Sequence, residues 1–130
     1  MAKILIVDDD RDFTDAVRLV LESAGHEVST AATREKGMAA VANSRPDLIV
    51  LDVMMEVPDD GFTMACDLRR QGCSVPILML SSIGRVTGFT FEKDEEMVPV
   101  DIFETKPIEP QKLLEKIEGL LKKRGGQANA

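Results

Sequence analysis

The chain has 130 residues, a formal net charge of −7, two cysteines and no tryptophan or tyrosine. This length suits one domain with its own core, and the charge argues against binding to nucleic acid through clustered Lys and Arg. No apolar run approaches membrane-spanning length, and nothing before Lys3 resembles a signal peptide. We therefore expect a cytoplasmic protein that uses no membrane contact and keeps both cysteines as free thiols.

Apolar runs alternate along the chain with segments of helical period. Residues 4–7 predict a strand buried on both faces. Apolar residues spaced by three and four from Phe13 predict a helix that Gly25 ends. A short alternating strand over 27–31 precedes a helix that begins at a Thr33 N-cap. The later predicted elements are a strand within 47–52, a helix between Gly61 and Gly72, a strand over 77–80, a short strand at 102–103 and a helix from Pro110.

This alternation predicts an α/β fold, a three-layer sandwich with helices on both faces of a five-stranded parallel sheet. The flavodoxin-like strand order 2-1-3-4-5 suits five such strands. We expect one domain over residues 1–124 and a disordered tail over 125–130. Segment 83–100, where a fourth helix is due, is interrupted by glycine and rich in β-branched and acidic residues. A short, displaced or disordered helix is therefore expected there.

Polar residues follow the predicted strands where each one ends. Asp8 and Asp9 come after the first strand, Asp52 closes the third, Ser81 follows the fourth and Lys106 follows the fifth. In the predicted order the first and third strands are neighbours about 4.8 Å apart, so the three acids converge at the edge where such sheets bind ligands. Mg²⁺ prefers oxygen ligands and is commonly completed by a phosphate. The pattern therefore indicates a magnesium and phosphate site.

Taken singly, these acids have simpler interpretations. A lone aspartate at the end of a strand usually caps a helix or forms a turn. Asp10 and Asp12 are better explained as acids in the first turn of a helix. The spacing of Asp8, Asp10 and Asp12 imitates a calcium loop, but Phe13 stands where that loop needs glycine. Only the combined set of acids, hydroxyl and amine favours a functional site.

This combined set resembles the receiver domain of two-component response regulators, of the stand-alone, chemotaxis type. The resemblance covers the chain from Lys3 to about Lys123. The stretches that carry it are Ile4-Leu5-Ile6-Val7-Asp8-Asp9-Asp10, Leu51-Asp52-Val53-Met54-Met55, Met79-Leu80-Ser81-Ser82 and Thr105-Lys106-Pro107. The resemblance implies that Asp52 accepts a phosphoryl group from a phosphohistidine on a sensor histidine kinase or a histidine phosphotransfer protein.

The same resemblance implies a ligand set for the metal. Asp9 and Asp52 would bind Mg²⁺ directly, or Mn²⁺ in its place, together with the backbone carbonyl of Met54. Asp8 would hold a metal-bound water. The loop after Asp52 departs from the family pattern, because Glu56 takes the usual proline position and one more residue precedes Gly61.

It also implies the residues that respond to the phosphoryl group. Lys106 would pair with its oxygens, and Ser81 would move to form a hydrogen bond with it. Phe103 matches the aromatic switch position. The Lys106–Pro107 peptide bond would be cis, which the weak trans preference of such bonds tolerates.

The sequence therefore predicts a phosphorylation-controlled switch or phosphorelay intermediate that acts on a downstream protein target. It is expected to be a signalling module that assists its own phosphorylation and dephosphorylation rather than an enzyme acting on other substrates. A dimer that forms on phosphorylation is a further expectation. Two alternatives stay open: a metal-dependent phosphatase with an aspartyl nucleophile, and a degenerate receiver that serves as a binding scaffold. The phosphatase alternative needs an acid two residues after Asp52, where Met54 stands.

Overall fold

The structure is a computed structural model that describes residues 2–52, 60–82, 102–106 and 108–128. The elements within these residues are β1 (Lys3–Val7), α1 (Arg11–Ser23), β2 (Glu27–Ala31), α2 (Arg34–Ser44), β3 (Leu48–Asp52), α3 (Asp60–Arg70), β4 (Ile77–Ser82), β5 (Ile102–Lys106) and α4 (Pro110–Ala128). The strands form one parallel sheet in the order β2-β1-β3-β4-β5. The predicted flavodoxin-like α/β fold and its strand order are confirmed.

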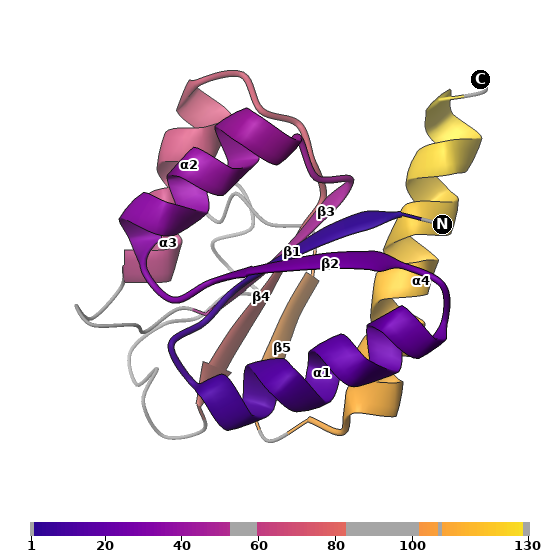
Figure 1. Ribbon diagram of the computed structural model, residues 1–130. Coiled ribbons are helices and arrows are strands. Elements are labelled where there is room, and N and C mark those ends of the chain that lie inside the picture. The colour runs from indigo at the N-terminus through magenta and orange to yellow at the C-terminus, as the bar shows by residue number, and fades with distance from the viewer. Residues whose placement is uncertain (1, 53–59, 83–101, 107, 129–130) are drawn as a thin grey trace.

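Helices cover both faces of this sheet (Figure 1). The sheet divides the core into two clusters. Alternate residues of a strand point to opposite faces. Ile4 and Ile6 of β1 accordingly pack with α1 and α4, whereas Leu5 and Val7 pack with α2 and α3. All five residues of β3 are buried, because this central strand is covered from both sides. Its unbroken apolar run in the sequence follows from that position.

Two helix starts are fixed by side-chain caps. The Asp10 carboxylate accepts a hydrogen bond from the Phe13 backbone N–H at 3.2 Å and caps α1. The Thr33 hydroxyl accepts from the Lys36 N–H at 3.1 Å and caps α2, as predicted. Each cap satisfies a backbone donor that lacks a partner inside the helix. Asp10, predicted as an acid of the first turn, is therefore the N-cap that precedes the first residue of the helix.

The C-terminal helix is longer than the sequence pattern indicated. It continues to Ala128, which includes residues 125–128. Glycines 125 and 126 suggested an earlier end because glycine has a low helix propensity. The disordered tail expected from residue 125 stays a prediction. The domain boundary at residue 124 stays a prediction.

Three further expectations concern the helix within 83–100, the cysteines and membrane contact. The helix expected within 83–100 lies outside the described residues, so the C-terminal helix carries the label α4. Cys66 and Cys73 are free thiols, as predicted. In the described part of the chain, no helix is both long enough and apolar enough to cross a membrane.

The two leucines of α1 test the division between core and surface. Leu21 is fully buried in the core shared with α4, whereas the side chain of Leu19 is 68% exposed on the same helix. We expect Leu21→Ala to lower the free energy of unfolding by about 2–5 kcal/mol, because it leaves a cavity. The matched Leu19→Ala change is expected to stay within about 0.5 kcal/mol. Urea denaturation of both variants measures the difference, and equal losses would contradict this packing.

Candidate functional site

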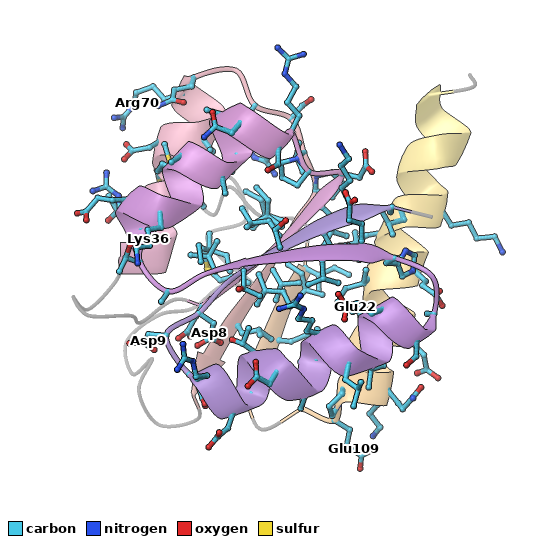
Figure 2. The ribbon with its side chains drawn as sticks, viewed as in Figure 1. Asp8, Asp9, Glu22, Lys36, Arg70 and Glu109 are labelled. Carbon is cyan, nitrogen blue, oxygen red and sulfur yellow. The ribbon has the colours of Figure 1, made fainter. Side chains whose placement is uncertain are left out.

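Three carboxylates meet at the C-terminal edge of the sheet. Asp8 and Asp9 directly follow β1, and Asp52 is the last residue of β3. Val7 pairs with Leu51 in the sheet, so Asp8 and Asp52 lie level on adjacent strands. One carboxylate oxygen from each of the three acids lies within 4.8 Å of the others. Figure 2 shows Asp8 and Asp9 together where β1 ends and the chain turns into α1. The predicted convergence of the three acids is therefore found in the structure.

Asp8 is held in place from two sides. Its backbone N–H donates to the Ala31 carbonyl at the end of β2, at 3.0 Å. Its carboxylate accepts a hydrogen bond from the Asp10 N–H at 2.9 Å. Since Asp10 also caps α1, the strand end, the neighbouring edge strand and the helix start form one connected unit. The sequence pattern did not predict these bonds, although three aspartates before a helical pattern are a signal for a cap.

Burial raises the electrostatic cost of holding these three carboxylates together. The relative solvent-accessible areas of Asp8 and Asp52 are only 4% and 6%, whereas Asp9 is exposed. Carboxylates this close repel one another, and the repulsion grows as water is excluded. A cation bound between them would relieve it.

The donor set fits a hard divalent cation. All three candidate ligands are oxygens, the atoms that Mg²⁺ prefers. One oxygen of each acid lies within 4.8 Å of the others, so all three acids could face one bound ion. Small side-chain adjustments, or a water between one acid and the ion, would accommodate Mg²⁺.

The strands that carry the other predicted site residues end at the same edge. Asp52 pairs with Leu80 of β4, which puts the backbone of Ser81 one residue beyond it. Lys106 is the last residue of β5 and pairs with Ser82, whereas Phe103 lies earlier in β5 opposite Met79. For Ser81, Phe103 and Lys106, the structure describes the position of the backbone. The Met54 carbonyl and the Lys106–Pro107 bond fall outside the described residues.

A polar contact that the sequence did not reveal joins the two helices on one face of the sheet. The Arg34 guanidinium of α2 binds the Asp67 carboxylate of α3, and Arg70 lies 3.4 Å from the other oxygen of that carboxylate. Sequence periodicity cannot find a pair on separate helices. Its effect is to tie α2 to α3.

Comparison with known proteins identifies the family. A model of the response regulator receiver domain matches residues 4–118. The DNA-binding dual master transcriptional regulator RpaA of Synechocystis sp. is 36% identical over 129 residues, which cover 95% of this chain and 50% of that protein. The alkaline phosphatase synthesis transcriptional regulatory protein PhoP of Bacillus subtilis is 34% identical over 128 residues, covering 93% and 49%. The chain thus spans about half the length of these relatives.

Solved structures agree with this match. The receiver domain of the Francisella response regulator 1452 superimposes with a TM-score of 0.82 at 26% identity, covering 95% of this chain and 99% of that one. A CheY-like receiver domain protein from Methanospirillum hungatei gives 0.80 at 28% identity, covering 98% of each chain. The chain therefore belongs to the response regulator receiver family, a class of phosphorylation-controlled switches in two-component signalling. Receivers of this class work with sensor histidine kinases and bind Mg²⁺ at an aspartate cluster.

The exposed member of the cluster offers a test of metal binding. We expect Asp9→Asn to weaken Mg²⁺ binding by about tenfold or more, while raising the stability of the metal-free protein by about 0.5–1 kcal/mol because one repelling charge is removed. Urea denaturation with and without Mg²⁺ measures both effects. At ten times its Kd, Mg²⁺ should add about 1.4 kcal/mol to the wild type.

The control for this test is Asp15→Asn, which makes the same chemical change at an exposed position of α1. It should keep the full stabilisation by Mg²⁺. If Mg²⁺ stabilised Asp9→Asn and the wild type equally, the cluster would not be the metal site.

Proposed function

We propose that Asp52 is the phosphoacceptor of this receiver, and that Asp8, Asp9 and Asp52 hold the Mg²⁺ needed for transfer, with Mn²⁺ as a substitute. The observation that carries the proposal is the approach of the three carboxylates to within 4.8 Å at the ends of two adjacent strands. The backbone carbonyl of Met54 is proposed as a further ligand on the strength of the family resemblance.

In the proposed reaction an oxygen of the Asp52 carboxylate forms a bond to phosphorus while the bond between phosphorus and the donor breaks. When bound, Mg²⁺ neutralises charge on the phosphoryl oxygens. Lys106 provides a second positive centre for these oxygens, and Ser81 provides a hydroxyl donor. The register that brings the ends of β4 and β5 to the edge of the acids supports both assignments. The chain acts on its own aspartate, which is why we treat it as a signalling module.

The phosphoryl group then acts as a switch. It adds a charge of about −1.5 to −2 and three hydrogen-bond acceptors to the site. We propose that Ser81 and Phe103 rearrange in response, with a cis bond before Pro107 keeping Lys106 in position. Reversing a strongly biased two-state equilibrium needs up to about 5.5 kcal/mol, and a few charge-assisted hydrogen bonds are of that order.

The donor is proposed to be a phosphohistidine on a sensor histidine kinase or a histidine phosphotransfer protein. The output is proposed to be contact with a target protein or a phosphorylation-dependent dimer. The relatives reported above are named as transcriptional regulators. That this chain acts as a single domain without contacting DNA stays a prediction. An immunoblot of source cells tests it, because a product at the 14.3 kDa of this chain supports the prediction and a markedly larger one contradicts it.

Phosphorylation itself can be tested with a small donor. Incubated with acetyl phosphate and Mg²⁺, the wild type and Asp15→Asn should each gain one phosphoryl group, labile to hydroxylamine, whereas Asp52→Asn should gain none. A chelator should abolish the gain, since the transfer depends on the metal. Intact-mass spectrometry provides the measurement. A scaffold would gain nothing in any form of the chain, and a phosphatase would instead turn over added phosphoesters.

A further inference from the structure

We propose that Arg11 is a specificity-determining residue of this site. Its guanidinium, at the start of α1, attracts anionic phosphodonors to the acid cluster and at the same time weakens the binding of Mg²⁺. The inference rests on the proposed role of Asp52 as phosphoacceptor. It adds to that role a residue outside the set of acids, hydroxyl and lysine.

The first observation is the position of Arg11. It is the first residue of α1, immediately after the capping Asp10 and two residues after Asp9. Two trans peptide units limit the distance between the Cα atoms of Asp9 and Arg11 to about 7.6 Å. Arg11 is also exposed. Arg11 is therefore anchored close to the rim of the cluster and is open to a molecule that approaches from solvent.

The second observation is that this charge is not paired with another group among the described residues. Within the described part of the chain, Arg11 takes part in no ion pair or side-chain hydrogen bond. Arg34, the first residue of α2, differs in this respect, because its guanidinium already binds Asp67. No described residue therefore pairs with the charge of Arg11 in place of an incoming anion.

The third observation is that the helix itself does not favour a cation at this position. The N-terminus of a helix carries a partial positive charge and prefers acidic residues in its first turn. Asp12 follows that preference, whereas Arg11 does not. The helix dipole therefore gives no reason for a cation at this position next to the acid cluster.

A positive charge at this rim has effects of opposite sign on the two ligands of the site. It repels Mg²⁺ and attracts the dianionic phosphoryl group of a donor such as acetyl phosphate. In the reaction with that donor, an Asp52 oxygen bonds to phosphorus and acetate leaves with the electrons of the broken P–O bond. Arg11 has no part in either bond change; it alters how often the donor reaches the site.

The test is Arg11→Gln in the full chain. We expect it to tighten Mg²⁺ binding about two- to fivefold by calorimetric titration, and to lower the second-order rate constant with acetyl phosphate about two- to fivefold at low salt and saturating Mg²⁺. Both differences should shrink as ionic strength rises. Arg11→Lys, which keeps the charge, should behave nearly as the wild type.

Arg18→Gln is the matched control. Arg18 is on the same helix about 10.5 Å further along its axis, and it already pairs with Glu22 at 3.2 Å. We expect neither constant to change in this variant.

Three results would overturn the inference: unchanged constants in Arg11→Gln, equal effects in Arg18→Gln, or a loss of both metal and donor reactivity, which would indicate a merely structural role. A wild type that accepts no phosphoryl group would instead refute the proposed function itself, so the two failures are distinguishable.

Discussion

The structure depends on one electrostatic conflict, which is the placement of three carboxylates within 4.8 Å of one another, two of them buried. Such a cluster persists only where the surrounding fold holds the charges together against their repulsion. Here the parallel sheet does so, because β1 and β3 are adjacent and end at the same level. The same conflict would be relieved by a divalent cation, so what is unfavourable for the bare fold would serve the proposed phosphoryl transfer.

The rigidity of that edge comes from both faces of the sheet. β1 and β3 are buried between two separate cores, one shared with α1 and α4 and the other with α2 and α3. Asp8 is further fixed by the Ala31 carbonyl and by the Asp10 N–H. A site held this firmly can transmit a new charge as a change in neighbouring elements instead of absorbing it locally, since packed interiors deform little. In this way the core supports the switch.

Much of this arrangement could be predicted from local patterns. The central strands were evident because burial on both faces demands continuous apolar runs, and the Thr33 cap was evident because hydroxyls satisfy free N–H groups at helix starts. Two glycines suggested a tail from residue 125, because glycine has a low helix propensity, whereas α4 continues to Ala128. The contact between Arg34 and Asp67 was missed, since it joins two helices that periodicity treats separately.

The candidate site shows the same division. The order of residues was enough to predict an acid, a hydroxyl or an amine at the ends of four strands, because strand ends are local features. These residues are Asp8, Asp52, Ser81 and Lys106. How near the three acids come, and that Asp8 is buried while Asp9 is exposed, emerged only from the folded chain. Those properties depend on strand register and on which helices cover each face. They are set by contacts between residues far apart in the chain, which no local pattern records.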